Sequence, residues 1–418
     1  PVCSSAASDV YKRQKLASFL YLEWLNFKYL KKHSQSLPDA VQGVMDESTF
    51  HKSVSYTQAK SKFSVLSAIY DAIILLLILT YGLIPFIYES LSGWVGQSLL
   101  AQSFVFVLSL FILGLPSVPL NWWNTFKLEE SFGFNKSTQK LWFLDQVKGF
   151  ILSVLIGVPL ILTLMWIVQK MGAYWWVWAF AVFWLFQVVM VVLYPMFILP
   201  LFNKLEPLES GELKDRLMAL GDRCGFKSKT IFVMDGSKRS GHSNAFFTGF
   251  GQFRRIVLYD TLIEQMEIDE LEAVLAHEIG HYKCGHIPQR LIFSAISSFL
   301  LFAFLGWLMQ ATWIFEAFAF SSTVQDYFVP AFLLIALFAG LFTFWLSPLD
   351  GLWSRKHEYE ADAFARNAMN GASPLINALR KLYNENLGNL IPHPFYSAFY
   401  YSHPTLVERE SALLNEDQ

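Results

Sequence analysis

The chain has 418 residues, of which 54% are hydrophobic and 17% aromatic, which exceeds the proportions of soluble globular proteins. Its 32 Lys and Arg residues against 34 Asp and Glu residues give a formal net charge of -2, so there is no basic excess for binding nucleic acid. Three cysteines are too few for a disulfide framework, and the composition therefore predicts a membrane protein whose polar part faces a reducing compartment.

The first 14 residues, PVCSSAASDVYKRQ, precede any apolar pattern and resemble neither a signal peptide nor a stop-transfer segment. We interpret residues 1–14 as a non-native or artefactual leader and exclude them from the predicted fold. An apolar helix follows over residues 16–30 and ends in two lysines. We interpret it as a truncated first membrane span.

Six further segments are free of charged residues over about the 20 residues that a bilayer requires. Together with the truncated first span they predict a mainly α fold with a seven-span transmembrane helical bundle. An N-terminal membrane region over 15–203 holds the first five spans, and a later pair occupies 291–349. The six charge-free segments are residues 72–88, 90–126, 149–169, 171–203, 291–315 and 328–349.

Lysines indicate which connections are cytoplasmic. Five lie in the connection over 31–62 and four in the connection over 127–148, whereas the alternate connections, 89–98, 170–174 and 316–327, hold one Lys and no Arg. Alternation then places the polar stretch 204–290 and the tail 350–418 together on the cytoplasmic side. We expect these two segments to form one α+β domain.

Within 204–290 the sequence predicts a helix over 212–224, then β-rich runs at 230–234, 244–250 and 255–259. A small sheet should therefore precede the next helix. That helix opens with Glu267, Asp269 and Glu270, acids that are favourable near a helix N-terminus, and continues through LEAVLAHEIGHYKCGH.

The HEIGH motif carries the predicted chemistry. His277 and His281 are four residues apart, so on a helix they share one face and can bind one metal ion. Glu278 lies about 100° round the helix, where its carboxylate can take a proton from metal-bound water. Gly280 is small enough for another segment to approach the metal. The motif predicts a zinc peptidase that binds one Zn²⁺ ion and uses Glu278 as its catalytic base.

A catalytic zinc ion usually has three protein ligands and a water molecule, so a third ligand must come from elsewhere. The segment SRKHEYEADAFA offers Glu358 and Asp362, which share a helix face beside two small alanines, 361 and 365. Glu358 would bind the metal, and Asp362 would orient a ligand histidine. From the pattern alone, His357 or Glu360 is equally able to reach the metal.

The order of these motifs resembles a known family. HEIGH is followed by two spans, by SRxxExxAD and by SHPxxxxR, as in peptidase family M48, which includes the CaaX prenyl proteases and the HtpX proteases. Three further segments resemble the CaaX prenyl protease 1 type and extend the similarity to essentially everything after Tyr21: NTFKLEESFGFNKST at 124–138, YPMFILPLFNKLEPL at 194–208 and KRSGHSNAFFTGFG at 238–251.

The resemblance implies roles for individual residues. Glu358 would be the third zinc ligand, and Asp362 would support the site. His403 would stabilise the tetrahedral intermediate as a second catalytic residue, because a hydrogen-bonding imidazole near the metal offsets developing negative charge. Arg409 matches the arginine of SHPxxxxR, with its role left open between support of the site and substrate binding.

The resemblance also implies that Asn244 and Ala245 bind the substrate backbone at the edge of a strand. A packed interior strand is equally compatible with the pattern. We interpret His242 and His286 as structural, the latter because it lies about 140° round the helix from His281. Asp71 should lie near the cytoplasmic end of its span and extend to the interface.

These observations predict an integral-membrane zinc metalloendopeptidase whose active site faces the cytoplasm. We expect it in a bacterial inner membrane, or in the endoplasmic reticulum membrane of a eukaryote, with the lipid bilayer and peptide or protein substrates as its partners. The resemblance implies cleavage near the C-terminus of prenylated CaaX proteins or a bacterial equivalent. The long, span-rich half before HEIGH argues against an HtpX-like quality-control protease, and the intact Glu278 argues against a catalytically silent scaffold. A di-iron membrane oxygenase would need more histidine boxes than the chain holds.

Overall fold

The computed structural model describes residues 2–38, 42–226, 230–248, 255–318, 320 and 328–415, with side chains from Arg13 onward. Short 3₁₀ or π segments are labelled η. The first half is helical and consists of α1 (Val2–His33), α2 (Glu47–Thr80), α3 (Leu83–Val95), α4 (Leu99–Gly114), η2 (Leu115–Ser117), α5 (Val118–Trp123), η3 (Asn124–Glu129), α6 (Gln139–Lys170), η4 (Gly172–Tyr174), α7 (Trp175–Leu193), η5 (Tyr194–Ile198) and α8 (Leu199–Phe202).

The second half combines a small sheet with further helices. In chain order these elements are β1 (Leu205–Pro207), α9 (Glu212–Arg223), β2 (Ile231–Met234), η6 (Gly236–Lys238), β3 (Ala245–Thr248), β4 (Arg255–Tyr259), α10 (Asp260–Gln265), α11 (Ile268–Lys283), α12 (His286–Leu308), α13 (Thr312–Ala317), α14 (Phe328–Ala368), α15 (Ser373–Glu385), α16 (Pro394–Tyr400) and α17 (Leu406–Leu414).

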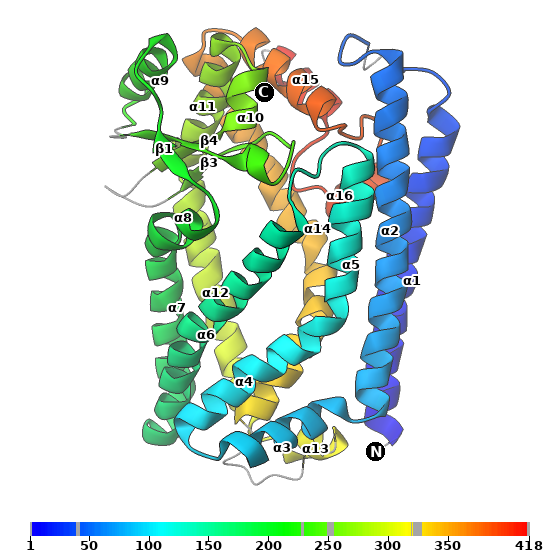
Figure 1. Ribbon diagram of the computed structural model, residues 1–418, viewed down its shortest axis with the longest axis vertical. Helices are drawn as coiled ribbons and strands as arrows, with labels where there is room; N and C mark the ends of the chain where they lie inside the picture. Colours follow the sequence, from blue (N-terminus) through cyan, green and yellow to red (C-terminus); the bar gives the residue numbers. More distant parts are fainter. Residues whose placement is uncertain are drawn as a thin grey trace.

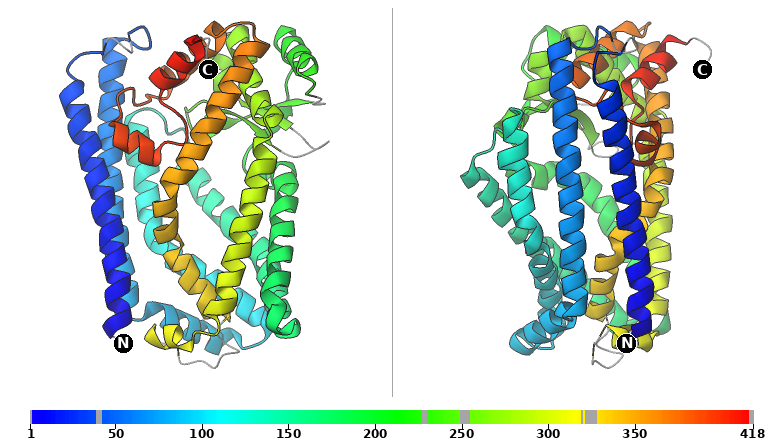
Figure 2. Two further views of the ribbon diagram at one scale, coloured as in Figure 1. Left: turned by 180° about the vertical axis from the view of Figure 1, so that it is seen from behind. Right: turned by 90° about the vertical axis from the view of Figure 1, so that its right-hand side faces the viewer.

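The long helices run between two ends of the molecule (Figure 1). The sheet, α9, α10, α11 and α15 gather at one end, at the top of Figure 1, whereas α3 and α13 lie across the opposite end. The rear view shows α1 and α2 side by side along nearly the whole length (Figure 2). This arrangement confirms the predicted helical membrane bundle with a peptidase region at one end.

Six helical stretches within the described residues are long and apolar enough to cross a membrane: Glu47–Thr80, Leu99–Glu129, Gln139–Lys170, Gly172–Phe202, His286–Leu308 and Phe328–Ala368. The expected truncated first span corresponds to α1, which is not among them and carries Lys15, Glu23 and Lys28. Residues 2–14, excluded above as a leader, continue α1, because neither Pro nor Gly interrupts the segment from Val2 to His33.

The bounds of the span expected over 72–88 are wrong, because the chain breaks inside this charge-free segment and the candidate span lies earlier, in Glu47–Thr80. Gly82 adopts a left-handed conformation with φ 58°, ends the path of α2 and starts α3 in a new direction. The 13 residues of α3 extend about 20 Å, too short for a hydrocarbon core of about 30 Å. The expected span over 291–315 is likewise divided between α12 and α13. In the connection 316–327, residues 319 and 321–327 lie outside the described part.

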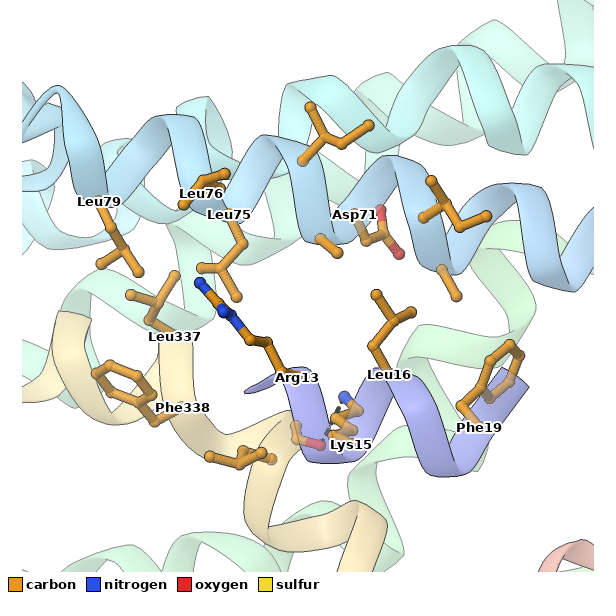
Figure 3. A pocket seen from close by; sticks show the side chains of 16 residues that line it. Arg13, Lys15, Leu16, Phe19, Asp71, Leu75, Leu76, Leu79, Leu337 and Phe338 are labelled. Carbon is orange, nitrogen blue, oxygen red and sulfur yellow. Dashed lines mark hydrogen bonds between the residues drawn. The ribbon is translucent and has the colours of Figure 1, made fainter. Parts of the chain in front are cut away.

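We expected Asp71 near the cytoplasmic end of its span, with its side chain extending to the interface. This expectation is wrong, because Asp71 lies in the second half of α2, away from the peptidase region. It lines a cavity of about 490 Å³ between α1, α2 and α14, together with Lys15 and Arg13 and otherwise mainly apolar side chains (Figure 3). Lys15 attracts Asp71 electrostatically and donates a hydrogen bond from Nζ to the Gly340 carbonyl at 2.8 Å. Opposite charge and a hydrogen bond within the bundle explain why these groups are tolerated there.

The four strands form one sheet in the order β1-β2-β4-β3. The central strands β2 and β4 are parallel, and β1 and β3 are antiparallel to their neighbours. In the β3–β4 pair, Ala245 lies opposite Leu258 and Phe247 opposite Ile256. The three predicted β-rich runs are thus present, although residues 249–250 of the second lie outside the described part. β1 was missed, since three residues give no periodic signal.

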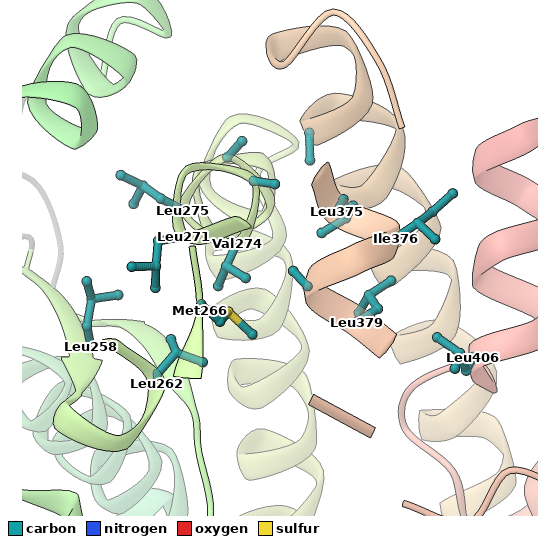
Figure 4. Close-up of a cluster of buried hydrophobic side chains, with 14 of the residues drawn as sticks. Leu258, Leu262, Met266, Leu271, Val274, Leu275, Leu375, Ile376, Leu379 and Leu406 are labelled. Carbon is teal, nitrogen blue, oxygen red and sulfur yellow. The ribbon is translucent and has the colours of Figure 1, made fainter. Parts of the chain in front are cut away.

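The two polar segments of the sequence pack into one hydrophobic core, as predicted. Leu258, Leu271 and Leu275 from the first segment belong to the same buried cluster as side chains of the tail, among them Leu375 and Leu379 (Figure 4). The same cluster includes Leu30, Phe50 and Val54, so the ends of α1 and α2 contribute to it and the core crosses the boundary expected at residue 204.

The helix α14 connects the bundle to the peptidase region. Its 41 residues extend about 60 Å, from one end of the molecule to the other. It contains Pro348, which removes the hydrogen bond to the Phe344 carbonyl, and Ser347 Oγ donates to that carbonyl at 2.8 Å instead. The helix bends in the left view of Figure 2. Its last turns carry the residues of the SRxxExxAD motif into the peptidase region.

Candidate active site

The helix α11 presents the HEIGH motif. Its N-terminus has a capping box, in which the Glu267 side chain accepts from the backbone of Glu270 and the Glu270 side chain accepts from the backbone of Glu267. Apolar residues of α11 lie in the core, which fixes the rotation of the helix about its axis. His277 and His281 therefore face the same direction, and their Nε2 atoms lie 3.2 Å apart.

Close packing brings α14 against this face of α11. A Cβ atom on Gly280 would lie 2.9 Å from Ala361 Cα and 3.0 Å from the Ala361 carbonyl oxygen, so no larger residue fits without movement of the backbone. The contact confirms the expectation that Gly280 admits a neighbouring segment, and it places Glu358, one turn before Ala361, beside the two histidines.

The donor atoms of three residues, His277, His281 and Glu358, form a compact triangle. Glu358 Oε2 is 3.4 Å from His277 Nε2, and Glu358 Oε1 is 3.4 Å from His281 Nε2. Ligands at 2.0 to 2.2 Å from a tetrahedral zinc ion lie about 3.3 to 3.6 Å apart, so the triangle fits such an ion. Glu358 Oε2 is buried without a hydrogen-bond partner among the described residues, and the charged group that faces it, Arg409 Nη1, is 3.8 Å away, so a metal ion would supply the direct partner that this oxygen lacks. The donors present therefore fit the metal that the sequence predicts.

The sequence left His357 and Glu360 as alternative ligands, and the structure places both away from the triangle. His357 Nε2 lies 3.0 Å from Gln289 Oε1, and Glu360 Oε2 lies 2.9 Å from His286 Nε2. Of the three candidates in this segment, only Glu358 points toward both histidines of the motif.

Asp362 and Arg409 support His277. Asp362 Oδ1 lies 2.8 Å from His277 Nδ1, as predicted for a carboxylate that orients the ring. Arg409 donates two hydrogen bonds to this carboxylate, from Nε at 2.8 Å and from Nη2 at 2.6 Å. Arg409 is buried, and burial tends to lower its pKa, but Asp362 raises it above the ordinary value. These contacts favour support of the site over the substrate-binding role that the sequence left open for Arg409.

Glu278 lies beside the triangle, close enough for His277, His281 and Glu358 to influence its charge. Burial raises its pKa above that of an ordinary glutamate, while the two histidines and a hydrogen bond from the Phe247 backbone counteract part of that rise. A carboxyl group with a raised pKa takes up a proton more readily, which suits a general base.

Strand β3 lies at the edge of the sheet, and α11, the helix that carries His277 and His281, contacts it. The Asn244 carbonyl accepts from Tyr259 N–H at 3.1 Å and so faces β4. Backbone groups alternate along a strand, so those of Ala245 and Phe247 face away from β4, and the Phe247 N–H donates to Glu278. Asn244 is exposed, and its Oδ1 accepts from Ala245 N–H at 2.9 Å. Of the two arrangements left open above, the part of the chain that the structure describes has the free edge, since no further strand there pairs with β3.

His403 faces the same site from the loop between α16 and α17. Its Nε2 lies 3.5 Å from Glu358 Oε1, and its Nδ1 lies 3.0 Å from Ser402 Oγ. Partial removal of water from the His403 ring lowers its pKa, although 61% of the side chain is exposed. The negative charge of Glu358 counteracts part of this decrease. Arg355 of α14 donates hydrogen bonds to the carbonyls of Ala398 and Tyr401 and thereby holds the segment before His403. The sequence gave no signal for this contact.

The expected position of His286 is wrong. Gly285 has a left-handed backbone with φ 72°, which ends α11 and starts α12. The turn brings the His286 ring back toward the motif, where His281 Nδ1 and His286 Nδ1 lie 2.9 Å apart. A glycine directly after a helical segment is a known stop signal, so Gly285 could have indicated this turn.

His242 joins two of the segments that resemble the CaaX prenyl protease 1 type. Its Nε2 lies 3.4 Å from Glu129, which also accepts from Tyr56 Oη at 2.9 Å. On the other side, Asn386 Oδ1 lies 3.0 Å from His242 Nδ1 and accepts from Ser243 N–H at 3.1 Å. The interpretation of His242 as structural agrees with these contacts, which hold the loop directly before β3.

Comparisons with known proteins agree with this arrangement. Residues 26–204 match a family described as CAAX prenyl protease N-terminal, five membrane helices, and residues 207–417 match peptidase family M48. CAAX prenyl protease 1 of Saccharomyces cerevisiae is 38% identical, with 95% of this chain and 93% of that protein covered. The human CAAX prenyl protease 1 homolog is 32% identical over 91% of this chain and 89% of that protein. The crystal structure of S. mikatae Ste24p has a TM-score of 0.86 at 36% identity and covers 97% of this chain and 98% of that one.

Proposed function

Because the chain belongs to peptidase family M48 and is an integral-membrane metallopeptidase, we propose that it uses one zinc ion to process the C-termini of prenylated CaaX proteins. The observation that carries the proposal is the triangle of His277, His281 and Glu358 beside Glu278 and the free edge of β3. Overall similarity to the CAAX prenyl proteases supports this substrate class over general membrane proteolysis of the HtpX kind.

Each residue of the site then has a chemical task. Bound zinc would polarise the scissile carbonyl and acidify a water molecule. Glu278 accepts the proton of the attacking water and delivers one to the leaving amine. The His403 ring donates a hydrogen bond to the oxygen that becomes negative in the tetrahedral intermediate. Asp362 and Arg409 hold His277 in the tautomer whose Nε2 faces the metal.

The substrate binds in this proposal as an additional strand beside β3. The outward carbonyl of Ala245 accepts a hydrogen bond from the main chain of an extended peptide. The Ala245 N–H becomes available when the exposed Asn244 side chain turns from it to the same peptide backbone. Such pairing is independent of side-chain identity, so it aligns many sequences across the metal site.

We place the active site on the cytoplasmic side, supported by the lysine-rich connections that precede the peptidase region. The sequence left a bacterial inner membrane and the endoplasmic reticulum as locations. The relatives described above come from eukaryotes, which supports the endoplasmic reticulum.

A farnesylated CaaX peptide tests the proposal. The purified wild type should cleave it on the C-terminal side of the modified cysteine, and Glu278→Gln should bind zinc yet lose about 10²- to 10⁴-fold in turnover, since Gln cannot accept the proton. The control substrates are the same peptide without its lipid and an unmodified membrane-protein fragment. Equal cleavage of the unlipidated forms would replace the prenyl-protease assignment by general membrane proteolysis, and no cleavage by the zinc-loaded wild type would indicate a silent scaffold.

A further inference from the structure

A second group of metal-ligating side chains lies directly beside the first. Among the described residues, Cys284, His286 and Glu360 each place one donor atom within 4.8 Å of the others. They come from the C-terminal end of α11, the first residue of α12, and α14 two residues after Glu358. Neither the family comparison nor the proposed hydrolysis uses these residues.

The donors suit a zinc-like ion. A thiolate, an imidazole nitrogen and a carboxylate oxygen are its usual protein ligands, and three of them leave a position for water. His286 is buried, whereas the Glu360 side chain is 38% exposed, so an ion has a path from solvent. Lys356 Nζ lies 3.8 Å from Glu360 Oε1, while Oε2 is the oxygen that faces the His286 ring.

The hydrogen bonds around His286 fix its tautomer as long as the first metal is bound. His281 Nε2 faces the triangle, so its proton is on Nδ1 and is donated to His286 Nδ1 at 2.9 Å. His286 then carries its own proton on Nε2, and Glu360 Oε2 accepts it at 2.9 Å. The chain of hydrogen bonds ends on a carboxylate and orients His281, as Asp362 orients His277.

A metal ion bound to Cys284, His286 and Glu360 changes which nitrogen of His286 carries the proton. A neutral His286 that binds metal through Nε2 must carry its proton on Nδ1, where it meets the Nδ1 proton of His281. Two donors then face each other at 2.9 Å, and His281 loses its acceptor. Loss of such an outer contact typically weakens metal binding or activity by about 10- to 100-fold. Because coupling is reciprocal, the first ion weakens the second by the same factor.

We infer that Cys284, His286 and Glu360 form a second, inhibitory metal site, and that its ion opposes the first ion through the shared contact between His281 and His286. The inference rests on the first metal site proposed above but not on its substrate. Binding releases the thiol proton of Cys284 and moves the single ring proton of His286 from Nε2 to Nδ1, so that His286 Nε2 and the Glu360 carboxylate both become ligands.

Equilibrium dialysis of the full-length purified protein against rising Zn²⁺ or Cd²⁺ tests the site, with bound metal and peptidase activity measured together. The wild type should bind one ion tightly and a second more weakly, and activity should fall as the second binds. Cys284→Ser should lose the second ion and the inhibition. The matched control is Cys224→Ser, which changes another half-buried free thiol outside the group and should behave as the wild type.

Two substitutions of His286 test the shared contact. His286→Asn keeps an acceptor oxygen where Nδ1 lies but has no Nε2, so it should lose the second ion and retain the affinity for the first. His286→Leu removes both atoms, and its affinity for the first ion should fall about 10- to 100-fold. In Glu358→Ala, which removes a ligand of the first site, the second ion should bind more tightly.

A wild type that binds one ion throughout the titration would overturn the inference, as would inhibition of Cys284→Ser at the same metal concentration as Cys224→Ser. Equal first-ion affinities of His286→Asn and His286→Leu would show that the two rings are not coupled. Dialysis needs no substrate, so failure to cleave a CaaX peptide would refute the proposed function and leave this result standing.

Discussion

The peptidase region and the membrane bundle bury their side chains in different ways. In α11 nearly every residue from Glu270 to Gly280 is buried against other parts of the protein. In the most apolar stretch of α2 only 6% of the residues are buried, and Leu66, Ile73 and Leu76 are each more than 50% exposed. Apolar residues of the first region therefore pack against protein, whereas many of those in the second are exposed, and Ile73 and Leu76 among them line the cavity between α1, α2 and α14.

This difference explains where sequence-based inference is accurate. A buried helix has its rotation fixed by the core, so the spacing of His277, Glu278 and His281 determines how the side chains point. A membrane-spanning segment requires only that its residues be apolar, so a break such as that at Gly82 leaves no trace in the charge pattern. The motifs predicted the residues of the site correctly. Hydropathy predicted which segments are apolar enough to lie in a membrane, but it did not predict where the helices begin and end.

The largest expected effect comes from the metal triangle. Glu358→Ala should reduce bound zinc from one ion to none at the first site and reduce activity to background, because two histidines alone bind weakly. Glu360→Gln, two residues away on the same helix, is the control and should retain the first ion. Metal analysis of the purified variants decides the result, with Cys284→Ser added to both so that the second group does not contribute, and full zinc in the Glu358→Ala variant would then identify another residue as the third ligand.

The difference in packing between the two regions predicts different effects of the same substitution at two glycines, both smaller than the loss expected for Glu358→Ala. Gly280→Ala should destabilise the protein by about 1 to 3 kcal/mol and lower its zinc content, because the new Cβ pushes α14 and Glu358 away from the histidines.

Gly149→Ala in α6 is the matched substitution, since nothing lies within 4 Å of its Cβ position. It should leave stability unchanged or raise it by about 0.4 to 1 kcal/mol. Thermal unfolding in detergent measures both variants, and equal midpoints would show that close packing at Gly280 does not support the site.

A third prediction concerns sidedness and involves no expected change in stability. In a background without native cysteines, Ser90→Cys in α3 should react with a membrane-impermeant reagent from outside, and Lys140→Cys at the start of α6 should react only after the membrane is opened. Both positions are exposed, whereas Ser92 of the same α3 is buried and unsuitable. The reverse pattern of labelling would place the peptidase region outside the cytoplasm.

The sequence by itself determined the HEIGH site, three of the four strands of the small sheet and the union of the two polar segments in one domain. In each case the information is local, since helical or strand periodicity fixes the direction of side chains within one element. The resemblance to a family added Glu358, Asp362, His403 and Arg409, which the structure brings to the same place.

The residue pattern left open which side chain of SRKHEYEAD reaches the histidines, and the resemblance implied Glu358. Only the tertiary structure supplies the physical reason, because the register of α14 against α11 depends on the contact between Gly280 and Ala361. It alone also placed His286 against His281, through the turn at Gly285, and Arg355 against the end of α16. These contacts join residues of different elements, and their distances follow from packing across the core rather than from spacing along the chain.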